Sequence, residues 1–129
     1  IPKVKKLLRN ANATTLIGTV IGFHEGTSSV TKKLEEAEEA IRLGADELDF
    51  VLNYSAFKEG NFQLIDQEII ACTKYCLENQ KVIKWIIETA ALTNEEIVVI
   101  SQRIREIVLK HFTIASAKNV FVRFLSFWS

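Results

Sequence analysis

The sequence predicts an α/β protein that forms part of a TIM-type (β/α)8 barrel, with about four parallel β/α units. Short apolar segments alternate with segments whose apolar residues recur at helical spacing, a pattern typical of parallel sheet with right-handed crossovers. The repeat is roughly 30–40 residues long, close to the unit of a barrel that needs about 250 residues in all, and the chain has 129. The alternative is a small open doubly wound sheet, but the sequence contains no G-x-G-x-x-G or G-x-x-x-x-G-K-[ST] motif that would support it.

Four segments are expected to form buried strands, because each is short, rich in Val, Ile, Leu and Phe, and bounded by polar or turn residues. They cover residues 15–23, 47–53, 81–88 and 119–125. A helical segment precedes each of them, which gives the order α-β-α-β-α-β-α-β.

The first two helices are marked by their caps. Residues 2–9 have apolar positions at helical spacing, with Pro2 near the first turn. The helix over residues 30–41 follows the capping candidates Ser28 and Ser29. It ends at Leu43-Gly44, where Gly44 suits a left-handed C-cap.

The other two helices also have recognisable starts. The helix over residues 62–76 opens at the turn pair Gly60-Asn61. The helix over residues 97–108 follows a T-x-x-E capping box that begins at Thr93.

Composition limits the classes of function. Hydrophobic residues make up 48% of the chain and the formal net charge is zero, so there is no electrostatic case for nucleic acid or an anionic membrane as a partner. No apolar run approaches the ~20 residues of a membrane span. Cys72 and Cys76 are too few for a disulfide scaffold and suit a reducing cytosol, so a cytoplasmic location is expected. Their spacing of one helical turn favours core packing over a metal site.

Strand parity divides the second and third strands between the helix layer and the barrel interior. The residues expected to face the helices are Leu48, Phe50, Leu52, Ile83, Trp85 and Ile87. The interior set includes Asp49 and Lys84, on consecutive strands. Such residues are almost never fully buried unless they are paired. The pattern leaves two interpretations open, a buried ion pair that fills space and a catalytic pair at the barrel mouth.

Three stretches resemble the deoxyribose-phosphate aldolase family. Residues 19–26, TVIGFHEG, are similar to that family's TVIGFPxG strand and loop. Residues 36–49, EAEEAIRLGADELD, are similar to its EAxxAIxxGADEIDMV, and residues 84–96, KWIIETAALTNEE, to its KVIIET…LTDEE. The resemblance corresponds to the family's third to sixth strands. It implies one partial aldolase barrel domain over residues 1–129, with the terminal barrel strands missing.

The resemblance implies a class I aldolase, a lyase that reversibly cleaves 2-deoxy-D-ribose 5-phosphate to D-glyceraldehyde 3-phosphate and acetaldehyde through a lysine Schiff base. It implies no metal and no cofactor, and a small sugar phosphate as the substrate. By position, Asp49 matches the family's proton-relay aspartate, and Lys84 matches a lysine that lines the active site. Another Schiff-base barrel aldolase with a different sugar phosphate is the alternative.

One departure from the family pattern bears on activity. The stretch that matches F-[VI]-K-[ST]-S-T-G is FVRFLS, which places Arg123 at the position of the imine-forming lysine. A guanidinium stays protonated and cannot form the imine. The family's second essential lysine and its phosphate-binding loops correspond to positions beyond Ser129, and His24 replaces a proline. We therefore expect the chain as given to be inactive alone.

Both ends of the sequence point to a truncated or frame-shifted piece of a larger domain. The chain opens on Ile1 and contains no Met, and residues 121–129 are mostly aromatic or aliphatic, unlike ordinary exposed termini. A tail that docks back onto the core is the alternative. A half barrel would expose two strand edges and its interior face, so the alternative function is a non-catalytic fragment that associates into a homo-oligomer.

Overall fold

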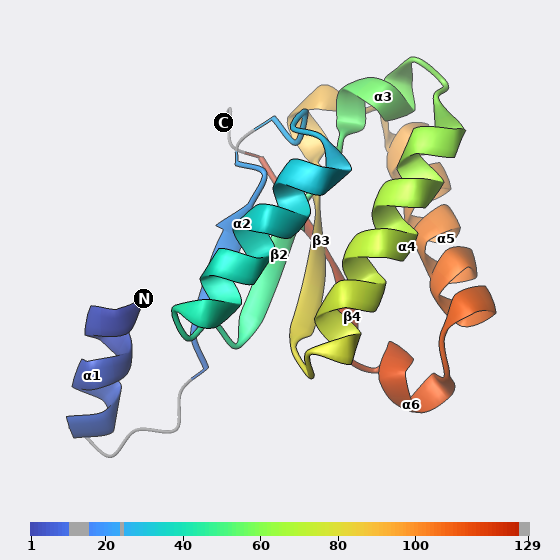
Figure 1. The fold of residues 1–129 in the computed structure, drawn as a ribbon. Helices are drawn as coiled ribbons and strands as arrows, with labels where there is room; N and C mark the ends of the chain where they lie inside the picture. The colour runs from blue at the N-terminus through green and yellow to red at the C-terminus, as the bar shows by residue number, and fades with distance from the viewer. Residues whose placement is uncertain (11–15, 24, 127–129) are drawn as a thin grey trace.

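The computed structural model describes residues 1–10, 16–23 and 25–126. Four parallel strands form one sheet in the order β1-β2-β3-β4. The strands are β1 (Gly18–Ile21), β2 (Glu47–Val51), β3 (Val82–Glu88) and β4 (Val120–Leu125). Neighbours in the sheet are also neighbours in sequence (Figure 1). The predicted fold class is therefore confirmed: the sheet is an arc of a (β/α)8 barrel.

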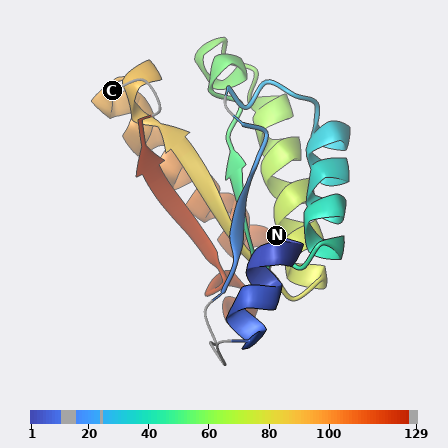
Figure 2. The ribbon, with the colours of Figure 1, turned by 90° about the vertical axis from the view of Figure 1, so that its left-hand side faces the viewer.

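Helices connect the strands and cover one face of the sheet (Figure 1). The long connecting helices are α2 (Val30–Arg42), α4 (Phe62–Glu78) and α5 (Asn94–His111), and α1 (Pro2–Asn10) precedes β1. Three elements of one turn complete the connections: α3 (Tyr54–Lys58), η1 (Thr89–Ala91) and α6 (Ile114–Ala117). Figure 2 views the molecule from the β1 side and shows α2 and α4 together on one side of the sheet.

The strand parity predicted for the helix-facing side is confirmed. The six residues expected there are buried in the core between sheet and helices: Leu48, Phe50, Leu52, Ile83, Trp85 and Ile87. The ring of Trp85 lies 5.4 Å from that of Phe50, and its Nε1–H donates a hydrogen bond to Thr73 Oγ1 at 3.1 Å. The largest side chain of the core is thus buried with its polar atom satisfied.

The predicted caps are confirmed at Ser29 and Thr93, and Asn61 of the predicted turn pair also caps its helix. Ser29 Oγ accepts a hydrogen bond from the Lys32 amide at 3.1 Å, and Asn61 Oδ1 accepts one from the amide of Leu64 at 3.3 Å. Thr93 and Glu96 form the reciprocal capping box, with distances of 3.1 and 2.8 Å. These bonds satisfy backbone donors that the first turn of a helix leaves unpaired.

The strands are shorter than predicted at their ends. β1 begins at Gly18 and stops at Ile21, because Gly22 turns the chain with φ 74°; residue 15 lies outside the described residues. β2 stops at Val51, because Asn53 already caps α3 through a 3.1 Å bond from the amide of Ala56. The one-turn elements were not predicted, since four or five residues carry too little periodicity to be recognised.

The face of the sheet opposite the helices is called the inner face. It carries Val20 on β1, Asp49 on β2, Lys84 on β3, and Phe121 and Arg123 on β4. Within the described residues, the outer edges of β1 and β4 pair with no other strand. No described helix has the length and apolar character that crossing a membrane requires.

Candidate active site

Charged side chains from three adjacent strands gather on the inner face. The sheet register pairs Asp49 with Lys84 across β2 and β3, and Ile86 with Arg123 across β3 and β4. Residues in register on parallel strands point to the same face. The sheet therefore places Asp49 and Lys84 side by side on the inner face, and Arg123 joins them from β4.

Each cation forms an ion pair with a carboxylate of β2, Lys84 with its diagonal neighbour and Arg123 across β3. Lys84 Nζ lies 3.1 Å from Glu47 Oε2, and Arg123 Nη1 lies 3.5 Å from Asp49 Oδ2. The sequence suggested an Asp49–Lys84 pair, but the ion pair of Lys84 is with Glu47. The Arg123 side chain is 51% exposed, so solvent screens its pair and the net stabilisation is small.

Asp49 is the buried member of this group. Its side chain is 10% exposed, and its Oδ1 is buried without a hydrogen bond from any described residue. Burial raises the pKa of Asp49, while the positive charges of Lys84 and Arg123 oppose the rise. A carboxyl group with a raised pKa and a free oxygen is suited to taking up and returning a proton.

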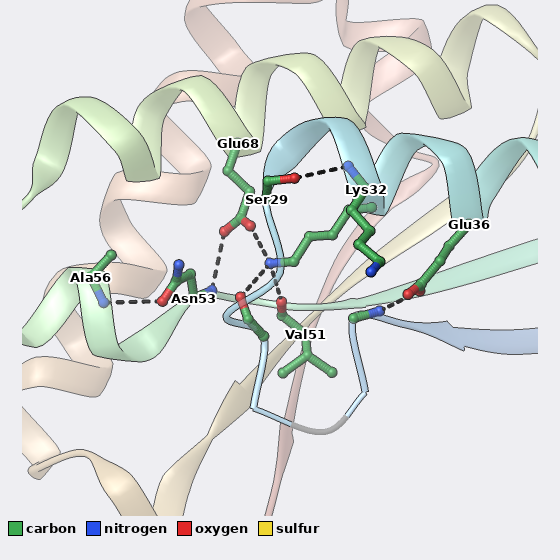
Figure 3. A network of polar contacts seen from close by, with 10 residues as sticks. Ser29, Lys32, Glu36, Val51, Asn53, Ala56 and Glu68 are labelled. Atoms are coloured by element: carbon green, nitrogen blue, oxygen red, sulfur yellow. Dashed lines mark hydrogen bonds and ion pairs between the residues drawn. The ribbon is translucent and has the colours of Figure 1, made fainter.

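A second charged network lies between α2, α4 and the end of β2 (Figure 3). Lys33 Nζ donates to the carbonyl oxygens of Gly26 at 2.7 Å and Val51 at 2.9 Å, and it forms an ion pair with Glu68 Oε1. The other oxygen of Glu68 accepts a hydrogen bond from the backbone N–H of Asn53 at 3.1 Å. The three donors of the ammonium thus have three acceptors. Burial raises the pKa of Glu68, and the charge of Lys33 opposes this.

This network fixes the loops that follow β1 and β2. Gly26 adopts φ 72°, and a Cβ atom there would lie 2.3 Å from the carbonyl oxygen of Leu52, so only glycine allows the two loops to approach this closely. The amide of Gly22 donates to Glu36 Oε2 at 2.8 Å, which holds the start of the same loop to α2 (Figure 3). The end of β2, two residues beyond Asp49, is therefore held rigidly from the helix side.

Lys33 and Glu68 were not predicted, although both carry a signal in the sequence. Strand parity places Glu47 on the face of Asp49, but its pairing with Lys84 was not predicted. Lys33 precedes the buried Ala37 by one turn, and Glu68 lies three residues after the buried Ile65. A charged residue within the apolar stripe of a helix must find a buried partner. Two such residues on the long helices α2 and α4 predict a buried ion pair between them.

The two cysteines pack in the core. Cys72 and Cys76 are free thiols on the buried stripe of α4. Burial raises the pKa of both, to about 12 for Cys76, so the reactive thiolate is scarce at neutral pH. No group of three or more His, Cys, Asp or Glu residues in the described part of the chain is arranged to hold a metal ion; His24 lies outside that part.

Comparison with known proteins relates this arrangement to a family of aldolases. Residues 2–122 match the model of the DeoC/LacD family aldolases. The deoxyribose-phosphate aldolase of Streptococcus pyogenes serotype M4 is 39% identical over 95 residues, which are 74% of this chain and 42% of the relative. The deoxyribose-phosphate aldolase of Metamycoplasma hominis is 37% identical over 102 residues, 79% of this chain and 45% of the relative.

A solved structure shows the same similarity in three dimensions. The deoxyribose phosphate aldolase of Aeropyrum pernix, described as having a unique tetrameric structure, matches with a TM-score of 0.68 and 25% identity. The match covers 81% of this chain and 42% of that one. The chain thus spans less than half the length of each of these three relatives.

Proposed function

The chain belongs to the DeoC/LacD aldolase family, and we propose that it carries the acid–base part of a deoxyribose-phosphate aldolase site without the amine that forms the imine. The proposed family reaction is the reversible cleavage of 2-deoxy-D-ribose 5-phosphate to D-glyceraldehyde 3-phosphate and acetaldehyde through a lysine Schiff base, with no metal or cofactor. The observation that carries the proposal is the buried Asp49, which faces Lys84 and Arg123 on the inner face.

The reaction needs a base as well as an amine. A lysine amine adds to the C1 carbonyl of the open-chain sugar and loses water, and the protonated imine then accepts the electrons of the C2–C3 bond as it breaks. A base must take the proton of the C3 hydroxyl, and an acid must return a proton to C2 before hydrolysis releases acetaldehyde. We assign this proton relay to Asp49, whose raised pKa and free oxygen suit it. Lys84 lies beside it as the lining cation.

The covalent step is absent in this proposal. By the family resemblance, Arg123 stands at the position of the imine-forming lysine, and a guanidinium cannot form the imine. Lys84 is the remaining amine on the described inner face, and its Nζ is engaged by Glu47 at 3.1 Å. An ammonium in an ion pair must leave its partner and lose a proton before it can attack. Loss of the nucleophile commonly costs several orders of magnitude in rate, approaching ~10⁶.

Trapping of the imine tests the proposal. The chain is incubated with 2-deoxyribose 5-phosphate and borohydride, and adducts are mapped by mass spectrometry. In a separate incubation without borohydride, acetaldehyde release is followed with alcohol dehydrogenase and NADH. We expect no adduct and no acetaldehyde. Arg123→Lys is expected to give an adduct at position 123, and the matched Arg123→Gln is not. A reduced adduct on Lys84 of the unaltered chain, with acetaldehyde release, would contradict the proposal.

A second candidate function is a non-catalytic half barrel that associates with itself. It is favoured by the two sheet edges that no described strand pairs with, and by the exposure of Val20 and Phe121 beside them, 40% and 48%. The tetrameric relative from Aeropyrum pernix adds support for a homo-oligomer. Sedimentation of the chain without substrate tests this candidate, because a stable dilute monomer would contradict it. We further infer that residues 1–129 form one domain, because the buried residues form one continuous core. We also infer that the chain acts in the cytoplasm, where free buried cysteines are common.

A further inference from the structure

Exposed apolar side chains gather at the two open ends of the sheet. At the β1 end they are Val4, Leu7, Leu16 and Val20, with exposed fractions from 40 to 58%. At the β4 end they are Leu109, Ile114, Phe121 and Phe124, with exposed fractions from 48 to 86%. Several exposed apolar side chains at each end of one sheet are unusual for a soluble monomer, so both ends are expected to be covered by a partner.

The β4 end has a groove on its helix-facing side. It is lined by Val120 and Val122 of β4, by Ala117, and by the flank of α5 that carries Val108 and Leu109. Its volume is about 180 Å³. The other flank of α5 is occupied by α4, to which it is tied by the Arg103–Asp66 ion pair at 2.6 Å. In a β/α barrel, the helix layer continues past each strand, so a further helix is expected in this groove.

The β1 end has a helix placed to fill such a groove. Helix α1 lies beyond the edge of β1 (Figure 1) and is tied to the start of β2 by Lys5 Nζ and Asp46 Oδ2 at 3.1 Å. Val4 and Leu7, one turn apart on α1, are 48% and 58% exposed. Val4 and Leu7 therefore have no cover within the described residues. The two ends of the molecule are complementary: one overhangs with a helix and the other has a groove.

We infer that the occupant of both ends is a second copy of this chain. The β4 edge of one copy pairs in parallel with the β1 edge of its partner, and the partner's α1 enters the groove beside α5. This inference develops the second candidate function and depends on the half-barrel fold alone. An arc of four strands is half of an eight-stranded barrel, so two copies related by a twofold axis close the sheet and leave no open edge.

Closure also explains why two copies suffice. The contact joins different surfaces, and such heterologous contacts form a ring when the rotation closes and a filament when it does not. A half-turn closes after two copies, and the same contact is then made twice. The inner-face charges of both copies would line one shared interior, with Arg123 of each copy beside β1 of its partner.

Sedimentation velocity of the whole chain, over concentrations from ~1 to ~100 μM, tests this inference. We expect one species of twice the 14.6 kDa chain mass. Leu7→Lys on α1 and Leu109→Lys on α5 change exposed residues, so they leave the protomer folded and are each expected to weaken dimerisation at least tenfold. Val99→Lys is the matched control for Leu109→Lys, because Val99 is 47% exposed on α5 as well but does not line the groove.

Hydrogen–deuterium exchange adds a test that is specific for the edges. We expect the amides of β1 and β4 to become protected with concentration, and those of β2 and β3 to stay unchanged. A monomer at all concentrations, a series of growing polymers, or a dimer that Leu7→Lys and Leu109→Lys leave intact would each overturn the inference. None of these results bears on the imine-trapping test, so failure of one proposal is distinguishable from failure of the other.

Discussion

Lys33→Met is expected to destabilise the fold strongly. The substitution keeps much of the apolar length of the side chain but removes the charge. It leaves the carboxylate of Glu68, only 1% exposed, without its cation, and the carbonyls of Gly26 and Val51 without a donor. Removing one partner of a buried ion pair costs about 3–5 kcal/mol. That is a large share of a domain stability of about 5–15 kcal/mol.

Urea unfolding, followed by circular dichroism and tryptophan fluorescence, measures the loss. The matched control is Lys32→Met, the same change at the next residue, which is exposed and is expected to alter stability by no more than about 0.5 kcal/mol. If Lys33→Met does not fold, Glu68→Gln provides a milder change, because the amide oxygen still accepts from the Asn53 amide. The double variant Lys33→Met/Glu68→Leu should recover about 1 kcal/mol or more, because it no longer buries an unpaired charge.

Equal effects of Lys33→Met and Lys32→Met would refute this reasoning, since burial would then not decide the cost. A double variant no more stable than Lys33→Met would also refute it. The loss would in that case arise from packing or from the two carbonyls, and not from the stranded carboxylate.

Three further predictions follow from the same structure. Thr93→Ala should cost about 1 kcal/mol through the lost cap of the 18-residue α5, whereas Thr113→Ala at the four-residue α6 should cost less in the same urea titration. Burial raises the pKa of Cys76 to about 12, so its thiol should react with a disulfide reagent at pH 8 only after unfolding. Because the pKa of Cys76 is higher in the folded state than in the unfolded state, the free energy of unfolding should fall as the pH rises from about 9 to about 12. Burial also raises the pKa of Asp49, so its ionised form opposes folding. Asp49→Asn should raise the urea midpoint at pH 7 and leave it unchanged near pH 3.

The sequence was sufficient to predict the frame of the fold, because its signals are local. Short apolar segments alternate with segments whose apolar residues recur at helical spacing, and this alternation predicts the parallel β/α order. The capping box at Thr93 marks the residue at which α5 starts. Parity along β2 and β3 predicts the buried Trp85 and the inner-face position of Asp49, since a strand has only two faces.

What the sequence could not predict depends on distances across strands. Parity assigns Lys84 to the inner face, but it does not say which carboxylate Lys84 will meet. Glu47 and Asp49 are two residues apart on the neighbouring strand, and side-chain length decides between them. The ammonium of Lys84 lies within 3.1 Å of Glu47, and Arg123 reaches Asp49 across β3 at 3.5 Å. Such diagonal neighbours become visible only when the register and twist of the sheet are known.

The two charged groups of this fold show that burial of charge alone does not identify a catalytic site. Lys33 is more deeply buried than Asp49, but its ammonium has three acceptors and Glu68 is bonded through both oxygens. A fully satisfied network of this kind favours one arrangement and is suited to holding loops. Asp49 instead has one oxygen without a partner among the described residues, and its other contact is a long one of 3.5 Å. Burying Asp49 Oδ1 without a hydrogen bond costs free energy. A substrate hydroxyl that supplies the missing hydrogen bond would recover it. The unsatisfied carboxylate is therefore the better candidate for chemistry, and the satisfied pair for architecture.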